Sequence, residues 1–306
     1  MKKIQFAVLA LVTTMSLSAE NTTKLRIWIG GEKTEYELST IDSLTFFTTT
    51  IEGPAAPVEP LEGVFSVSPD KQVHFSKGNL QYTQSTNTWA FAENQYGMIG
   101  GANINDSDLA DKIDLFGWSG STGIAKWGVS VSEDSEDYSG DFVDWGMNMD
   151  DGITWRTLSI EEWQYLIFYR TDAGSKYGVA SIYVTTDDSE RVNGLVILPD
   201  NWICPEGATF RGGMSNDYGE QAFGDYQSFS LEQWKKLESA GAVFLPATGR
   251  REGNNVYSAF EYGNYWSSSC SNGHLAYDFS IDSDGLYLGG DDPRSYGYAV
   301  RLVQDL

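Results

Sequence analysis

Residues 158–170, LSIEEWQYLIFYR, carry apolar side chains at the spacing of one helix face. Ser159 and Glu162 have the S-x-x-E spacing of a capping box, in which each side chain binds a backbone N–H of the other residue. Leu158 and Trp163 occupy the positions of a hydrophobic staple around the same N-cap. The pattern therefore predicts a helix that begins after Ser159.

The same signals recur in residues 229–241, FSLEQWKKLESAG. Ser230 and Gln233 have the capping-box spacing, and Gly241 is typical of the position that follows a helix end. Each predicted helix is followed by a short apolar run ending in Leu-Pro, at 194–199 and at 242–246. The remaining chain has the short apolar runs of strands separated by long polar segments. Two helices, scattered strands and long loops predict an α+β fold.

Apolar patterning and composition also divide the chain into four parts. We expect a signal peptide at 1–19, a small N-terminal β segment at 20–50, a Pro-rich linker at 51–62 and one main domain at 63–306. The β segment shows period-two alternation between 24 and 47, which indicates a meander of two or three strands. Such a segment is too small to be stable alone.

The N-terminus has the charged start, apolar run and small-residue exit of a secretory signal. Lys2 and Lys3 precede the apolar run Ile4–Leu17, which is too short for a stable membrane span. No second long apolar segment follows. We therefore expect an exported protein without membrane insertion, located in the periplasm, at the cell surface or outside the cell.

The charge of the chain limits its partners. It has 43 acidic and 20 basic residues, a net charge of −23. This sign opposes binding to nucleic acid and to anionic membrane surfaces, and is compatible with cations, carbohydrates or basic protein surfaces. Aromatic residues make up 14% of the chain, so large rings are expected to fix its loops against the core.

A resemblance emerges from several segments between residues 73 and 303. VHFSKGNLQYTQSTNTWAFAENQYGMIGGAN, IDLFGWSGS, GLVILPDNW, GAVFLPATGRR and YWSSS…AYDFSIDS…RSYGYAVRLV resemble exported bacterial proteins with a C-type-lectin-like fold. That fold is shared with the formylglycine-generating enzymes and with retroelement-diversified variable proteins of gut Gram-negative anaerobes. The resemblance covers 63–306 and implies two helices, short antiparallel sheets and long ordered loops. It also implies that the C-terminal strand-loop-strand segment faces a ligand.

The period-two pattern of that segment separates an inward from an outward face. With Tyr265, Trp266, Val300 and Leu302 as core anchors, the residues predicted to face inward are Leu275, Tyr277, Phe279, Ile281, Leu286 and Leu288. The predicted outward, ligand-binding residues are Cys270, Ser271, Asn272, His274, Asp278, Ser280, Asp282, Asp284, Tyr287, Asp291, Asp292 and Tyr296. Tyr, Ser and Asn suit a binding surface because they combine contact area with hydrogen bonds. Periodicity alone favours a solvated strand face, and it is the resemblance that favours a ligand-binding surface.

These residues predict an exported cell-surface binding or adhesion protein whose ligand is an unknown protein or glycan. One alternative is a fimbria-associated tip or structural subunit that contacts other surface or fimbrial subunits. A further hypothesis concerns the outward set, which consists of amino acids that adenine randomisation of an asparagine codon can produce. Diversification by a retroelement would explain that composition, and so would an ordinary acidic surface.

A second alternative is an orphan metal-dependent oxidase of the formylglycine-generating type. Those enzymes use two closely spaced cysteines, whereas Cys204 and Cys270 lie far apart and either form one disulfide or stay free. His74 and His274 are the only histidines and lie in no metal-ligand motif. The sequence therefore predicts no catalytic residue and no cofactor. Calcium stays open because IDSDG at 281–285 has part of a calcium-loop pattern, without its full spacing or terminal Glu.

Overall fold

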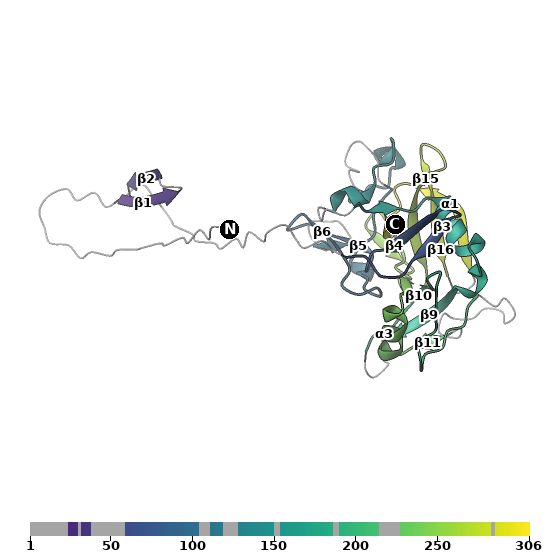
Figure 1. Ribbon diagram of the computed structural model, residues 1–306. Coiled ribbons are helices and arrows are strands. Elements are labelled where there is room, and N and C mark those ends of the chain that lie inside the picture. Colours follow the sequence, from purple (N-terminus) through teal and green to yellow (C-terminus); the bar gives the residue numbers. More distant parts are fainter. Residues whose placement is uncertain are drawn as a thin grey trace, which may run out of the picture. The chain divides into compact units, whose positions relative to one another are not determined.

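The computed structural model describes residues 24–29, 32–37, 59–103, 111–118, 128–149, 154–185, 190–213, 227–282 and 285–306. The chain divides into two compact units, Met1–Gly53 and Pro54–Leu306. In the first, β1 (Lys24–Ile29) and β2 (Glu32–Glu37) pair as an antiparallel ribbon (Figure 1). The predicted signal peptide and most of the predicted linker lie outside the described residues.

The second unit is a mixed α+β structure, as predicted, with two short helices and five small sheets in its described part. Its strands are β3 (Phe65–Ser68), β4 (Lys71–Phe75), β5 (Leu80–Thr83), β6 (Thr88–Phe91), β7 (Lys112–Ile113), β8 (Arg156–Thr157), β9 (Tyr177–Tyr183), β10 (Arg191–Ile197), β11 (Ser228–Phe229), β12 (Val243–Pro246), β13 (Arg250–Glu252), β14 (Asn255–Tyr257), β15 (Gly263–Cys270), β16 (Leu275–Ile281), β17 (Leu286–Pro293) and β18 (Leu302–Asp305). Short 3-10 turns lie at Gly100–Ala102, Ser135–Tyr138, Trp145–Asn148 and Ala173–Ser175.

Both predicted helices are present and begin as their capping boxes predict. In α1 (Ile160–Gln164) the Ser159 hydroxyl accepts from the Glu162 N–H, and the Glu162 side chain accepts from the Ser159 N–H. In α3 (Leu231–Ser239) the same reciprocal pair forms between Ser230 and Gln233. Contrary to the single α-helix that we expected, α1 continues as a π-helical segment over Tyr165–Tyr169.

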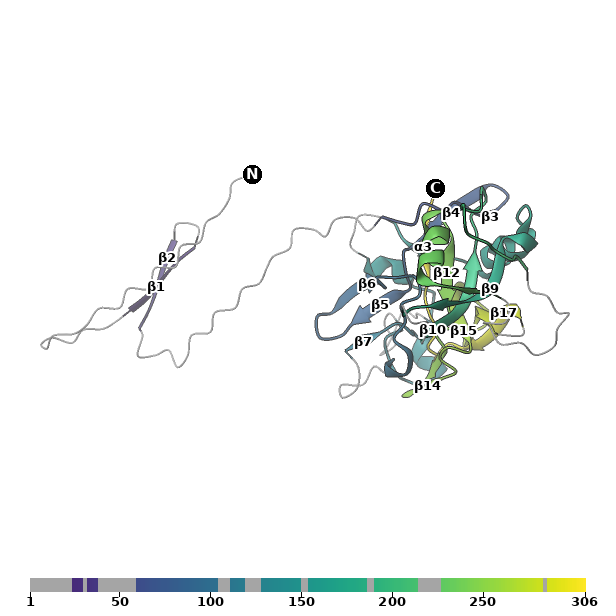
Figure 2. The same cartoon turned by 90° about the horizontal axis from the view of Figure 1, so that it is seen from below.

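Sheet pairing joins distant parts of the chain. The four-stranded sheet β3-β4-β18-β8 places β18 between β4 and β8, and both pairings are antiparallel. A second four-stranded sheet, β11-β9-β10-β12, lies beside α3 (Figure 2). The last long strands form the antiparallel sheet β15-β16-β17, which we call the C-terminal sheet.

The C-terminal sheet contributes side chains to two hydrophobic clusters. Tyr265 and Phe279 belong to the cluster that contains Trp163 of α1. Trp266 and Ala276 belong to a second cluster, which contains Tyr298. Since neighbouring residues of a strand point to opposite faces, the two clusters lie against opposite faces of this sheet. A third cluster packs α3 onto β9, β10 and β12.

Candidate functional site

One face of the C-terminal sheet is apolar and buried. Tyr265, Phe279 and Ile281 are fully buried, and Leu286 and Leu288 pack against the same cluster. We call these five residues the core face. The ring of Phe279 lies 5.0 Å from that of Trp163, which places α1 directly over this face. The predicted inward direction of Phe279, Ile281, Leu286 and Leu288 is therefore confirmed.

The opposite face is polar at the positions that we predicted to bind a ligand. Cross-strand register places Asn264 opposite Ser280, Ser280 opposite Tyr287, and Asp278 next to them on the same side. Asp292 follows on this side of β17. We call Asn264, Asp278, Ser280, Tyr287 and Asp292 the polar sheet face. It brings together four of the twelve predicted site residues.

A hydrogen-bond chain runs across the polar sheet face. The Asn264 amide donates to the Ser280 hydroxyl at 2.9 Å. Ser280 in turn donates to the Asp278 carboxylate. Three side chains from two strands are thus held in fixed orientations, as a preorganised binding surface requires.

Asp278 is 1% exposed, so its predicted exposure is wrong. Trp266 lies opposite it on β15, and the ring of Tyr298 packs 4.4 Å from that of Trp266. The second hydrophobic cluster, which contains Trp266 and Tyr298, thus covers the Asp278 end of the polar sheet face. Burial raises the pKa of Asp278 to about 7, and the nearby Asp292 carboxylate adds to that effect.

Tyr298 connects the buried and the accessible parts of this face. Its hydroxyl donates to the Asp292 carboxylate at 2.7 Å, and burial together with Asp278 and Asp292 raises the pKa of this phenol. Its neighbour Tyr296 is half-buried, and the two rings lie 6.2 Å apart. The Arg250 guanidinium lies 5.6 Å from the Tyr296 ring and pairs with Glu252 at 2.7 Å. The edge of the polar face therefore carries an aromatic ring and a paired arginine.

A glycine bulge shapes this face. Asp278 pairs with Gly290 and Phe279 pairs with Leu288, so Gly289 is an extra residue in β17. Gly289 has a φ of 102°, which only glycine adopts readily. At Gly290 a Cβ would lie 3.2 Å from the Asp278 Oδ1, so the missing side chain leaves room for the carboxylate.

Three predicted site residues lie instead in the turn between β15 and β16, where Asn272 and His274 are exposed and Ser271 is half-buried. Cys270 is the exposed last residue of β15 and lies opposite Ala276, on the side of the polar sheet face. The Asn272 side chain accepts from the backbone N–H groups of His274 and Leu275. The backbone carbonyl of Asn272 accepts from the Arg294 guanidinium at 2.6 Å. His274 lies 3.3 Å from the Glu136 carboxylate. Asn272 therefore shapes the turn, and the structure does not bring Ser271, Asn272 and His274 into the polar sheet face.

The remaining predicted residues occupy separate positions. Asp282 is half-buried and accepts from the Gly285 N–H at 2.8 Å in the turn after β16. Asp291 is exposed but pairs with Tyr277, so it points to the side opposite our prediction. Tyr277 and Leu275, predicted inward, are only half-buried. Asp284 lies outside the described residues.

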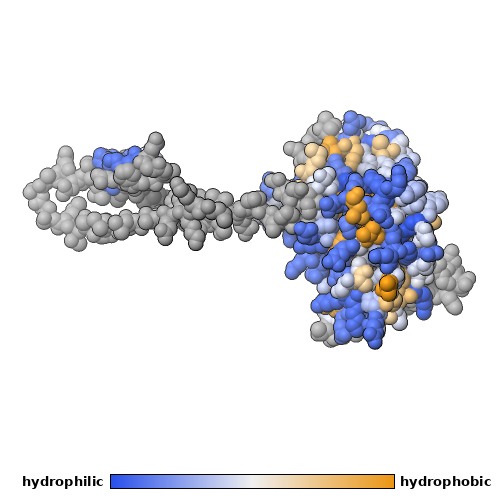
Figure 3. Space-filling model, in the orientation of Figure 1, coloured by the Kyte–Doolittle hydropathy of each residue, from blue (hydrophilic) through white to orange (hydrophobic). Residues whose placement is uncertain are grey.

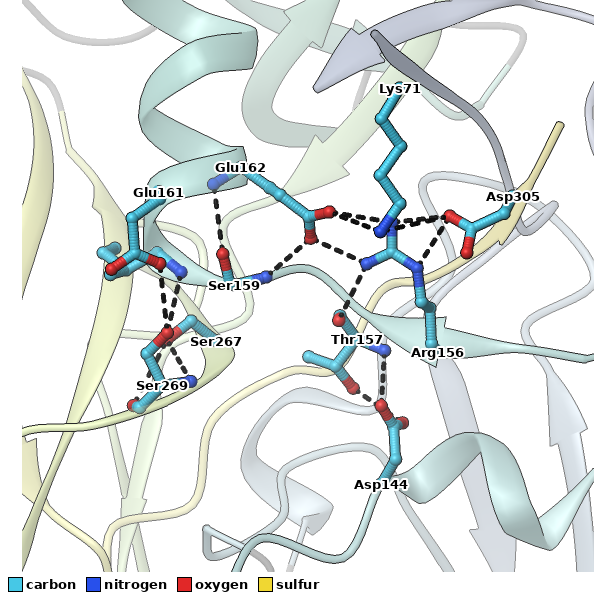
Figure 4. Close-up of polar contacts among 11 residues, drawn as sticks. Lys71, Asp144, Arg156, Thr157, Ser159, Glu161, Glu162, Ser267, Ser269 and Asp305 are labelled. Atoms are coloured by element: carbon cyan, nitrogen blue, oxygen red, sulfur yellow. Dashed lines mark hydrogen bonds and ion pairs between the residues drawn. The ribbon is translucent and has the colours of Figure 1, made fainter. Parts of the chain in front are cut away.

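The serine run of β15 has a structural role. The Ser267 hydroxyl donates to the Tyr277 carbonyl at 2.7 Å and accepts from the Ser269 N–H. The Ser269 hydroxyl accepts from the Ile160 N–H at the start of α1 (Figure 4). These hydroxyls satisfy backbone groups where the β15–β16 register shifts between Trp266 and Cys270.

Among the described residues of the second unit, the most extensive ionic contacts lie beside α1. Arg156 pairs with Glu162 at 2.7 Å and with Asp305 at 2.7 Å, and Lys71 contacts both carboxylates (Figure 4). Hydrogen bonds from Arg156 and Lys71 hold the pKa of Glu162 below its usual value, against the opposing effect of burial. This network connects β4, β8 and β18 to the start of α1, so its role is structural.

Sequence reasoning missed Asn264, Arg250 and Tyr298 as parts of this region. Asn264 had a usable signal, because it lies two positions before Trp266 and therefore shares its face. Arg250 and Tyr298 had none, since their places depend on tertiary packing. Cys204 and Cys270 are both free and exposed. Of the two alternatives left open by the sequence, the structure therefore shows two free thiols and no disulfide.

Comparison with known proteins identifies no relative of this chain: no family model, no curated protein and no solved structure matches it. Within the described residues, no group of three or more His, Cys, Asp or Glu side chains is placed to hold a metal ion. A search of the same residues finds no helix with the length and hydropathy of a membrane span.

Proposed function

We propose that this is an exported binding protein that contacts its ligand through the polar sheet face and its Tyr296 edge. The observation that carries the proposal is the asymmetry of one sheet. Its core face is closed by α1, while its other face holds oriented carboxylate, hydroxyl and amide groups beside tyrosine rings. Such a mixture gives contact area and hydrogen bonds on rigid strands, which is how specific binding surfaces are built.

The C-type-lectin-like fold and the cell-surface location are part of the same proposal. Support for the fold comes from the two capped helices, the short antiparallel sheets and the pairing of β18 with β4. Adhesion to a protein or a glycan is the activity that this architecture and the secretory signal pattern favour together.

A screen of the purified chain against arrays of glycans and proteins tests the proposal. For any ligand found, Tyr287→Ala should weaken binding by about tenfold, because truncating an aromatic contact in a binding surface costs on the order of 1–2 kcal/mol. Asp291→Asn is the matched control, since Asp291 is an exposed residue of the same strand on the opposite side. Equal effects of the two substitutions would refute the assignment of the face.

A further inference from the structure

Exposed aromatic residues follow closely in sequence at the end of β14 and in the loop that leads to β15. Tyr257, Phe260 and Tyr262 are 44%, 46% and 45% exposed. These three rings lie within six residues of chain, and we call residues 257–262 the aromatic loop. The part of the surface seen in Figure 3 is largely hydrophilic, with small apolar patches. Three exposed rings so close in sequence on such a surface make this segment a candidate interaction site.

The backbone holds these rings in place at a conformational cost. Ser258 and Phe260 have φ values of 53° and 73°, a left-handed conformation that is disfavoured for residues with a side chain, and most of all for a bulky one. Both backbone polar groups of Phe260 are hydrogen-bonded. Its N–H donates to the Ala247 carbonyl at 2.8 Å, and its carbonyl accepts from the Asn193 side-chain amide at 2.7 Å. A strained backbone held by its surroundings is typical of functional loops.

Charge indicates what kind of partner fits. Glu261 is exposed between Phe260 and Tyr262, and Arg250, which lies opposite Tyr257, is already paired with Glu252. The chain as a whole carries 43 acidic and 20 basic residues. An anionic partner would be repelled, whereas a cationic segment would be drawn to the surface from a distance and could stack on the rings.

In the described part of the chain, the cations that lie over aromatic rings are arginines. The guanidinium groups of Arg294, Arg250 and Arg170 lie 4.2, 5.6 and 5.8 Å from the ring centres of Trp118, Tyr296 and Phe65. A planar guanidinium stacks on an aromatic face, which a lysine ammonium cannot do. We propose that the aromatic loop binds arginine side chains of a basic protein segment. The proposal does not depend on the polar sheet face being a binding site.

The test uses the full chain and three synthetic peptides of identical length, which carry arginine, lysine or citrulline at the same positions. Citrulline keeps the shape of arginine without its charge. We expect the arginine peptide to bind about threefold more tightly than the lysine peptide and the citrulline peptide to bind weakest. Raising the salt concentration should weaken binding of both charged peptides.

The decisive variant is Tyr257→Ala/Phe260→Ala/Tyr262→Ala, because it removes the rings without changing the net charge. It should lower affinity for the arginine peptide by about tenfold and abolish the preference over lysine. The control variant Phe168→Ala/Tyr169→Ala removes two other exposed rings, 47% and 69% exposed, and should bind as the wild type does. If the triple variant misfolds, Phe260→Gly removes one ring and relieves the left-handed strain.

Three outcomes overturn the proposal. The first is that the arginine and lysine peptides bind equally tightly and that the triple variant binds both as the wild type does, which would mean a general attraction of basic peptides to an acidic protein. Equal binding of the citrulline and arginine peptides would exclude a role for the charge. Loss of glycan binding in the triple variant, without any loss of peptide binding, would assign the rings to a carbohydrate.

Discussion

The core face and the polar sheet face belong to the same three strands, yet they are closed in different ways. The core face lies under α1, whose Trp163 ring contacts Phe279. On the polar sheet face, Trp266 and Tyr298 pack beside Asp278, Asn264 is also buried, and Tyr287 stays exposed. The contrast shows that alternation decides which side a residue points to, while the element packed across it decides whether that residue is buried.

The largest expected effect tests whether the covered end of the polar face is as structural as the core face. Trp266 is 1% exposed and donates to the Phe116 carbonyl at 2.6 Å. Trp266→Ala should lower the free energy of unfolding by about 3–5 kcal/mol, the range for deleting a buried aromatic side chain. Urea denaturation measures it. A loss below about 1 kcal/mol would mean that this end is open rather than packed.

The next effect concerns the buried carboxyl of Asp278. Its pKa rises from an ordinary 3.8 to about 7 on folding, chiefly through burial. Below pH 3.8 the Asp278 carboxyl is protonated in both the folded and the unfolded state, and its contribution to the free energy of unfolding is fully present. As the pH rises from 3.8 to 7, the carboxyl ionises in the unfolded state but stays protonated in the folded state. Stability should therefore fall over this window, by at most about 4 kcal/mol.

Asp278→Asn isolates that contribution, because the amide does not titrate and Ser280 can still donate to it. Denaturation curves of wild type and variant between pH 4 and 8 give the difference in unfolding free energy. We expect the variant to gain stability relative to the wild type as pH rises. A difference that stays constant with pH would show that Asp278 is accessible to water.

A smaller effect tests the bulge that shapes the polar face. Gly289→Ala places a side chain on a residue with a φ of 102°, which should cost about 1–2 kcal/mol of unfolding free energy. Gly273→Ala is the matched control in the neighbouring turn, since a Cβ there meets no atom within 4 Å. Thermal unfolding compares the two variants. Similar melting temperatures would remove the argument that the bulge is required.

The smallest effect should come from Asp291, which is exposed on the other side of β17. Asp291→Ala should change the unfolding free energy by no more than about 0.5 kcal/mol, as surface substitutions usually do. A clearly larger loss in the same urea series would mean that Asp291 has a structural contact on that side.

The sequence was informative wherever the controlling interaction was local. Ser159 with Glu162 and Ser230 with Gln233 determine two helix starts within four residues, and both are present. The inward direction of Phe279 also follows from simple alternation.

The sequence was uninformative where a distant residue decides the outcome. Asp278 is buried because Trp266 and Tyr298 pack beside it, and nothing within its own strand signals that contact. Asn272 shapes a turn through its carboxamide, which composition cannot separate from a ligand contact. For a diversified surface, these two positions would therefore tolerate replacement less well than the exposed Tyr287.

The place of β18 between β4 and β8 has a consequence for how the protein is made. Residues 71–75 are translated early, yet their antiparallel partner is Leu302–Asp305. A ribosome releases the chain in sequence, so β4 has no partner on that side until the last described strand has left the exit tunnel. Such long-range pairing makes folding slow and largely post-translational.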